Sequence, residues 1–194
     1  GNSSWKALLP RLGLLANSCE PQRMQTKLLR IPLFVFSLLF LVSCGGVSSI
    51  RSAENFTSQQ VLRGVNQERA KRGLKPLVPD GQLGLLASQH ASYLARNVDP
   101  TRGRPRPSAA HAGFKQRSRR AEKQGYRVVS EVVMIGYAGD LSAVAGRTIK
   151  GWLSSASHRA AILHPDRRVM GVETRLPADG RYFVVGLLSN GRGR

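Results

Sequence analysis

Residues 151–163, with the sequence GWLSSASHRAAIL, combine a large aromatic residue, a run of serines, a histidine and an apolar helical end. The serines interrupt one apolar helix and predict the start of a second, because serine favours helix starts over helix interiors. This break places His158 in the first turn of a new short helix, facing whatever lies above it. We therefore expect the rest of the chain to supply partners for His158.

The overall composition fits one globular domain with a strong positive charge. The chain has 194 residues, of which 41% are hydrophobic and 21% charged, which allows a real core and excludes a disordered chain. Its net charge of +19 predicts attraction to anionic polymers, lipid head groups or acidic glycans. The two cysteines, Cys19 and Cys44, lie outside the body of the chain, so no disulfide is expected within the domain.

Residues 24–44 have the pattern of a secretory signal peptide. The basic residues Lys27 and Arg30 precede an apolar run at 31–42, which is followed by small residues. This run is shorter than the ~20 residues that span a bilayer, which favours a signal peptide over the alternatives of a buried helix or a short membrane anchor. The sequence LVSC at 41–44 resembles a bacterial lipobox, in which the cysteine is lipidated and becomes the first mature residue.

These signals predict a division of the chain into five parts. We expect an upstream extension without structure at 1–23, the lipoprotein signal peptide at 24–44, a polar linker at 45–56, the domain at 57–190 and a frayed tail at 191–194. Removal of residues 1–43 takes away five Lys or Arg and one acid, so the mature chain keeps a net charge of +15.

The first half of the domain is predicted to be helical. Thr57 and Gln60 fit a capping box that opens the first helix, and Gly73 fits its end. Asp80 can cap a second helix, whose apolar face includes His90 as a core histidine. Residues 101–108 are rich in proline and arginine, so they predict a basic flap without regular structure. A short polar helix with several basic residues follows at 115–123.

The second half contributes the predicted strands. Residues 128–135 form a mostly apolar run with one carboxylate, Glu131, inside it. Asp140 can cap a helix that runs into the central stretch. The Asp-Gly turn at 177–180 predicts a hairpin of two final strands. Helices and antiparallel strands in this order predict an α+β fold.

Three polar residues stand in apolar or capped settings: His111, Glu131 and His158. Two neutral imidazoles can hold a divalent transition metal, and a carboxylate can orient a ligand or act as a base. A Ser–His hydrolase is the alternative, since Ser155 and Ser157 flank His158, but no G-x-S-x-G elbow supports it. A structural polar network is the remaining interpretation, and Glu131 could equally be a surface residue of a half-exposed strand.

The chain resembles the CAP superfamily of cysteine-rich secretory proteins, antigen 5 and pathogenesis-related proteins, in its bacterial SCP-like branch. The resemblance runs from about residue 57 to 188 and is carried by Asn66-Gln67-Glu68-Arg69, Gly73, Leu77, Leu83, Ala87, His111, Glu131, Trp152-x-x-Ser155-x-x-His158-Arg159, Ile162-Leu163 and Gly171-Val172. It implies an α-β-α sandwich with a central antiparallel sheet and a large cleft. In some members of the family, histidines and acidic residues of this cleft hold a divalent metal, often zinc.

By this resemblance, His111 and His158 match the two cleft histidines and Glu131 matches the glutamate of a Gly-Glu-Asn motif. Ser130 and Val132 replace the glycine and asparagine of that motif. Ser155 stands where secreted eukaryotic members have a second glutamate, and Ala161 where bacterial relatives often have asparagine. One acidic ligand is therefore missing, which puts metal affinity in doubt and favours a binding module over a catalyst.

The family has no single agreed activity, so two functions compete. The first is a lipid-anchored, monomeric envelope protein that binds an anionic or lipidic ligand in a cleft lined by His111, Glu131, Ser155 and His158. The alternative is a metal-dependent, peptidase-like hydrolase in which His111 and His158 hold Zn²⁺ or another divalent cation and Glu131 is the catalytic base. Nucleic-acid binding is not expected, because the basic stretches lack interleaved aromatic residues.

The lipobox leads to a direct test of the anchor. Labelled palmitate should enter the protein expressed in a bacterial host, and the Cys44→Ser variant should stay unlabelled because it lacks the thiol that is acylated. Equal labelling of the two proteins would exclude lipidation at Cys44.

Overall fold

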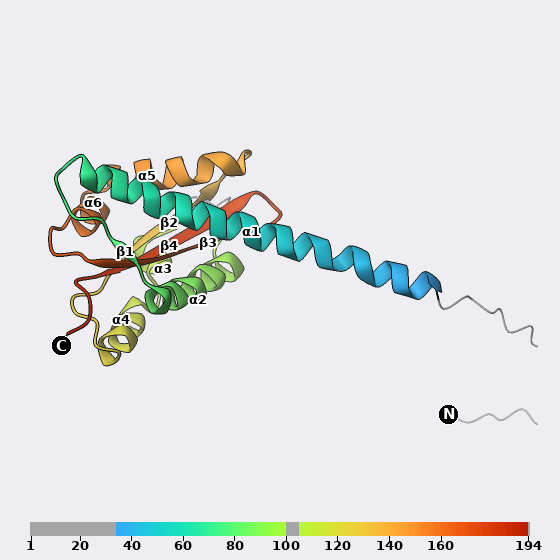
Figure 1. The fold of residues 1–194 in the computed structure, drawn as a ribbon, viewed down its shortest axis with the longest axis horizontal. Helices are drawn as coiled ribbons and strands as arrows, with labels where there is room; N and C mark the ends of the chain where they lie inside the picture. The colour runs from blue at the N-terminus through green and yellow to red at the C-terminus, as the bar shows by residue number, and fades with distance from the viewer. Residues whose placement is uncertain (1–33, 100–104, 194) are drawn as a thin grey trace, which may run out of the picture.

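The computed structural model describes the backbone of residues 34–99 and 105–193, with side chains from residue 48 onward. Within these ranges the chain forms three layers, with a four-stranded sheet between two layers of helices (Figure 1). The α-β-α arrangement predicted from the sequence is therefore present. The upstream extension, residues 24–33 of the predicted signal peptide, the side chain of Cys44, and residues 101–104 of the predicted flap lie outside the described residues. Residues 34–44 of the predicted signal peptide form the first part of a helix.

The bounds of the elements follow the chain. They are α1 (Phe34–Ala70), β1 (Val78–Pro79), α2 (Gly81–Asn97), α3 (Pro107–Ala110), α4 (Phe114–Lys123), β2 (Ser130–Tyr137), η2 (Leu141–Ala143), α5 (Val144–Ser154), α6 (Ala156–Ile162), β3 (Val169–Arg175) and β4 (Arg181–Ser189). Helices α1, α5 and α6 cover one face of the sheet, and α2 and α4 cover the other (Figure 1).

Helix α1 begins earlier than the sequence predicted. It is continuous through residues 45–56, so this segment is helical instead of a linker, and Thr57 lies inside the helix without capping it. The physical reason is a tertiary contact. The carboxylate of Glu54 accepts a hydrogen bond from the backbone N–H of Leu176 at 2.9 Å, which holds this turn of α1 against the end of β3. The predicted end is confirmed, since Gly73 has a φ of +67° and closes a Schellman-type turn.

The sheet has the strand order β1-β3-β4-β2. Its main ladders are antiparallel, as predicted, and the hairpin of β3 and β4 turns through Gly180 with a φ of +80°. The two-residue strand β1 pairs in parallel with β3, so the sheet is mixed at that edge. The two residues of β1 are too few to show a strand pattern in the sequence.

The core lies on both faces of the sheet, because residues of β4 alternate between the two helical layers. Val184 and Leu188 pack with Trp152 on the α1–α5 side, whereas Phe183 and Val185 pack against α2 on the other. Trp152 is fully buried, as expected for an aromatic residue beneath the site. The predicted apolar face of α2, including His90, is buried as well.

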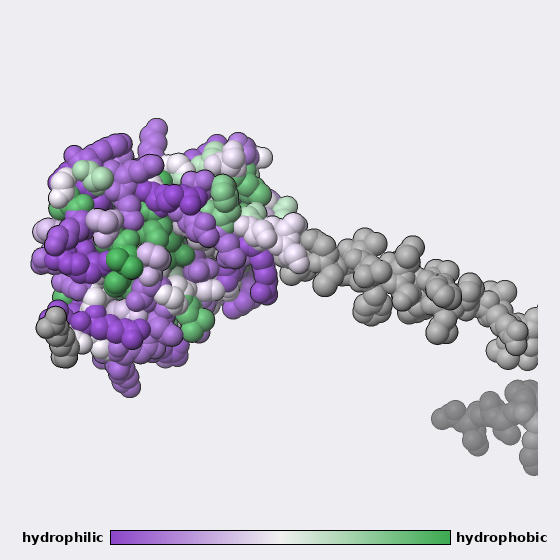
Figure 2. All heavy atoms as spheres, viewed as in Figure 1, coloured by the Kyte–Doolittle hydropathy of each residue, from purple (hydrophilic) through white to green (hydrophobic). Residues whose placement is uncertain are grey.

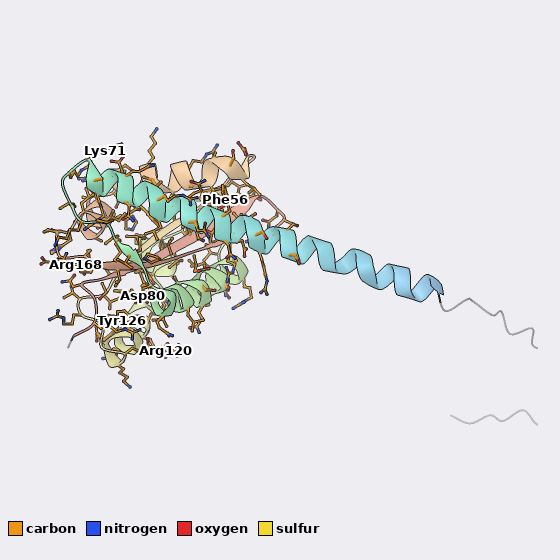
Figure 3. The ribbon with its side chains drawn as sticks, in the orientation of Figure 1. Phe56, Lys71, Asp80, Arg120, Tyr126 and Arg168 are labelled. Atoms are coloured by element: carbon orange, nitrogen blue, oxygen red, sulfur yellow. The ribbon has the colours of Figure 1, made fainter. Side chains whose placement is uncertain are left out.

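Two segments predicted to be irregular are ordered. Pro107 opens the short helix α3, because proline is well suited to the first turn of a helix, so the irregular flap ends earlier than expected. The tail up to residue 193 is paired instead of frayed. Tyr126 and Arg192 form a β-bridge, and the Arg192 guanidinium lies over the ring of Tyr126. The Tyr126 hydroxyl in turn donates to Asp80, the cap of α2, at 2.6 Å (Figure 3).

Asn66 and Arg69, which lie one turn apart on α1, are structural residues. The amide of Asn66 exchanges two hydrogen bonds with the backbone of Leu77. The side chain of Arg69 is fully buried, and its guanidinium donates to four backbone carbonyls, those of Lys75, Ile162, His164 and Arg167. Arg69 therefore joins the end of α1 to the segment that connects α6 with β3.

The surface on the side of α1 and α2 is mostly hydrophilic, with hydrophobic residues gathered between the two helices (Figure 2). These residues belong to a groove that includes Leu62 of α1, Leu85 of α2 and Val172 of β3. Among the residues with described side chains, no helix is long and apolar enough to span a membrane.

The position of Arg69 makes it a test of the fold. We expect Arg69→Met to lower the free energy of unfolding by about 4 kcal/mol, because four buried carbonyls lose their donor. Arg72→Met is the matched control, since Arg72 is largely exposed and pairs with Glu68 at the surface, and it should cost less than about 0.5 kcal/mol. Urea unfolding measures both, and equal losses would contradict the structural role of Arg69.

Candidate functional site

A cleft of about 520 Å³ lies along the outer edge of β2, between the two helical layers. One wall comes from residues 105–111, which include α3 and His111. The opposite wall comes from α5 and the start of α6, with Ser155 and His158. Residues Val133–Ile135 of β2 form the floor. The central stretch of the sequence thus contributes Gly151, Ser154, Ser155, Ser157 and His158 to the cleft.

Glu131 is buried just behind this cleft, and its partners come from a different helix. The side chain is 1% exposed. Arg117 of α4 donates two hydrogen bonds to the carboxylate, from Nε to Oε2 at 2.8 Å and from Nη2 to Oε1 at 2.9 Å. His111 Nδ1 donates a third, to Oε1 at 2.9 Å. Of the two interpretations of Glu131, the buried and paired one is therefore confirmed.

The pairing keeps Glu131 ionised. Burial by itself would raise the pKa of its carboxyl group, but the hydrogen bonds from His111 and Arg117 outweigh burial and hold that pKa below its ordinary value. Both carboxylate oxygens already accept hydrogen bonds. Glu131 therefore acts as a fixed anion that orients His111.

The two histidines meet across the cleft. Their ring centroids are 6.0 Å apart, with an angle of 55° between the ring planes. Because Nδ1 of His111 donates to Glu131, Nε2 of a neutral His111 ring keeps its lone pair. Burial and the neighbouring His111 lower the pKa of His158, so the His158 ring is neutral at neutral pH. Both imidazoles can thus act as acceptors or metal ligands.

As predicted, one helix ends and another begins at the serines of residues 151–163. No serine side chain caps the second helix, however. Ser155 occupies the N-cap position of α6, but its hydroxyl makes no capping bond and lies 3.2 Å from the hydroxyl of Ser157. Among the described hydrogen bonds, none joins either serine to His158. The structure thus brings Ser155 and His158 into one cleft without forming a Ser–His catalytic pair.

Two residues at the site could not be identified from the sequence. Arg117 is one of several basic residues on a polar helix, and nothing in that pattern separates it from its exposed neighbours. His90 approaches Glu131 to 3.8 Å from α2, but burial lowers the pKa of its imidazole, so this contact is not an ion pair. His90 Nε2 instead donates to the carbonyl of Ala110 at 2.8 Å and supports the wall that carries His111.

The residues present fit a metal only in part. Within the described part of the chain, no group of three or more His, Cys, Asp or Glu side chains is arranged to hold an ion. His111 and His158 offer two imidazole nitrogens, and the carboxylate of Glu131 behind His111 orients its ring, as carboxylates often do for histidines that bind metals. A metal held here would need water or a ligand to complete its coordination.

The sequence matches the model of the cysteine-rich secretory protein family, termed CAP, over residues 62–188. No match was found among curated protein sequences. The matched range contains every residue of the cleft that is described above, including both histidines and Glu131.

Several solved structures share the fold. An outer surface protein from Borrelia burgdorferi is 21% identical, with a TM-score of 0.56 over 71% of this chain and 93% of its own. An extracellular protein containing an SCP domain from Bacillus anthracis (24% identical, TM-score 0.52) and a cysteine-rich secretory protein from Staphylococcus aureus (19%, 0.51) match over 72% and 71% of this chain. This chain spans only 42% and 39% of those two proteins.

The ionised state of Glu131 gives a pH-dependent prediction. Its folded pKa is lowered from the ordinary value of 4.5, so its contribution to stability is present above that value and is lost as the pH falls through the folded pKa. Glu131→Gln should lower the free energy of unfolding at neutral pH by about 3 kcal/mol, because Arg117 loses its counter-ion. The difference between the two proteins should shrink in acid.

Urea unfolding at a series of pH values measures this difference. Glu122→Gln is the control, because Glu122 is exposed on α4 and accepts from the nearby hydroxyl of Ser118. It should leave the pH dependence of unfolding unchanged. A Glu131→Gln variant that unfolds like the parent at every pH would show that the buried carboxylate is not paired as described.

Proposed function

Because the chain belongs to the cysteine-rich secretory protein (CAP) family, we propose that it is an exported envelope protein that binds an anionic ligand in the cleft between His111 and His158. One observation carries this proposal. The cleft wall presents two imidazoles and several serine hydroxyls, and no acidic residue is among its described lining residues. The serine hydroxyls and the N–H of the neutral His158 ring can donate hydrogen bonds to an anion, and no carboxylate among these residues repels it.

The state of Glu131 supports binding over catalysis. A hydrolase of the kind considered above needs a carboxylate that can take a proton from water. The carboxylate of Glu131 has a lowered pKa and three hydrogen bonds from His111 and Arg117, which makes it a weak base. The loss of an acidic residue at Ser155 removes the other carboxylate that could serve.

The charge around the cleft mouth supports an anionic ligand. Arg106 is exposed between the two lining prolines Pro105 and Pro107, and Lys150 is exposed next to Gly151 on the opposite wall. Both cations belong to the part of the chain after residue 43, which carries a net charge of +15. Cations at the mouth of a cleft raise the local concentration of anions and speed their association.

Export and anchoring rest on the N-terminal pattern. The signal-like residues 24–44 and the lipobox cysteine Cys44 would place the domain on the outer side of a bacterial membrane, held by a lipid. Such a location supplies anionic polymers and lipid head groups as ligands. It also separates the protein from nucleic acid, despite the high content of arginine.

A divalent metal is part of this proposal as an aid to binding. The ring nitrogens of His111 and His158 would hold it, and the metal would add positive charge at the point where the ligand binds. The chain's own contribution is to keep His158 neutral and to orient the His111 ring through Glu131.

Calorimetric titration with zinc tests the histidine pair. We expect weak binding to the parent protein, because only two protein ligands converge. The heat of binding should disappear in His111→Ala and in His158→Ala. His164→Ala is the matched control, since His164 lies outside the cleft and should bind zinc like the parent. If the two cleft variants also bind like the parent, the proposed cleft metal is excluded.

A further inference from the structure

The cleft lies on an open edge of the sheet. Strand β2 pairs with β4 on one side and stands last in the strand order, so its other side has no strand partner among the described residues. Residues Val133–Ile135, in the middle of β2, are the ones that line the cleft. The floor of the binding site is therefore the edge of a β-sheet.

The direction of the backbone groups at this edge follows from the ladder. In an antiparallel pair, residues alternate between those whose N–H and C=O face the partner strand and those whose groups face away. Ala138 N–H donates to the carbonyl of Gly180 at 3.0 Å, in the same register as β2 and β4, so Ala138 faces the partner. Its neighbour Tyr137 must then face away. The Tyr137 carbonyl indeed accepts from the side chain of Arg147 at 3.1 Å, on the outer side of β2.

The same alternation turns the backbone groups of Ile135 and Val133 into the cleft, at spacings of two residues or about 7 Å. Their N–H and C=O groups form a regular row of donors and acceptors. Among the described backbone hydrogen bonds outside regular elements, none satisfies this row. A second extended peptide presents the same groups at the same spacing, and for this reason peptides add to open sheet edges.

The two edges of the sheet are protected in different ways. The opposite edge ends in β1, which has two residues, one of them Pro79. Short strands and prolines are common means of blocking edge-to-edge association. Strand β2 has eight residues with neither proline nor lysine. Its protection comes instead from the cleft walls that flank it, which carry His111 and His158 and hold their rings 6.0 Å apart.

We propose that the cleft takes an extended acidic peptide, which adds to β2 as a fifth strand. This inference rests on the proposed function and gives its anionic ligand a chemical class. Val133 and Ile135 would bind the peptide backbone, and the two histidines would face its side chains from the walls. Three exposed cations surround the edge, namely Arg106, Arg147 and Lys150, and no described lining residue of the cleft is acidic. This positive charge favours carboxylates on the peptide.

The test uses an acetylated and amidated octapeptide of alternating threonine and glutamate, added to the metal-free protein. Amide hydrogen exchange is followed by NMR with and without the peptide. We expect the exchange of Val133 and Ile135 to slow by at least about tenfold, whereas Val132 and Met134, which already bond to β4, should change little. This alternation distinguishes strand addition from any other contact in the cleft.

A variant pair tests the same row of groups. Ile135→Pro removes one outward N–H at an edge position, where proline is tolerated, and should weaken peptide binding by about tenfold. Ile135→Val keeps the N–H and should bind like the parent. Zinc titration of both variants shows whether the histidine pair is intact, so a misfolded variant cannot be mistaken for a positive result.

The outcomes distinguish the addition of a peptide strand to β2 from the binding of an anion between His111 and His158. Shifts of the His111 and His158 signals together with alternating protection support both. Shifts of these signals with uniform or no protection of β2 overturn strand addition and leave the anionic cleft standing. If neither the histidine signals nor the β2 amides respond to the peptide, an acidic peptide is excluded as the ligand, and zinc titration alone then decides the role of the histidine pair.

Discussion

The buried ion pair between Glu131 and Arg117 is the interaction on which the site depends. A carboxylate on a core strand is costly unless its charge is paired and its oxygens are satisfied, and the guanidinium fork of Arg117 does both. This contact ties α4 to β2. The remaining hydrogen bond of the carboxylate then fixes the ring of His111 opposite His158. One buried charge thus positions a helix, a strand and a cleft wall.

Much of the fold could be predicted because its signals are local. The cap at Asp80, the apolar face of α2, the turn at Gly180 and the serine break before His158 are each specified by residues within a few positions of one another. The start of α1 could not be predicted in this way. Threonine with glutamine three residues later also occurs inside helices, and only the contact of Glu54 with a distant strand shows that the helix continues.

Long-range partners explain the other differences. In the sequence, Arg69 looks like a solvated helix residue. The carbonyls that accept its hydrogen bonds come from positions 75 and 162–167, so no local pattern points to them. At the site, His111, Glu131 and His158 stand out in the sequence by their apolar or capped settings and by their match to a family pattern. Arg117 instead lies among similar basic residues on one helix. Only the packing of α4 against β2 distinguishes the arginine that pairs with Glu131. A charge in an apolar strand predicts that a partner exists without saying which residue it is.

The constraint on Glu131 also bears on what the cleft can recognise. Because its carboxylate is neutralised behind the wall, the negative charge of the site is directed inward, and the cleft shows a ligand imidazoles, hydroxyls and the backbone of β2. Side-chain donors at the walls and backbone groups at the floor are matched by one kind of ligand, an extended chain that carries both amides and acids. A free anion would use only the walls, and a neutral strand only the floor. The geometry therefore favours a ligand that uses both, with selectivity arising from the combination of charge and extended shape.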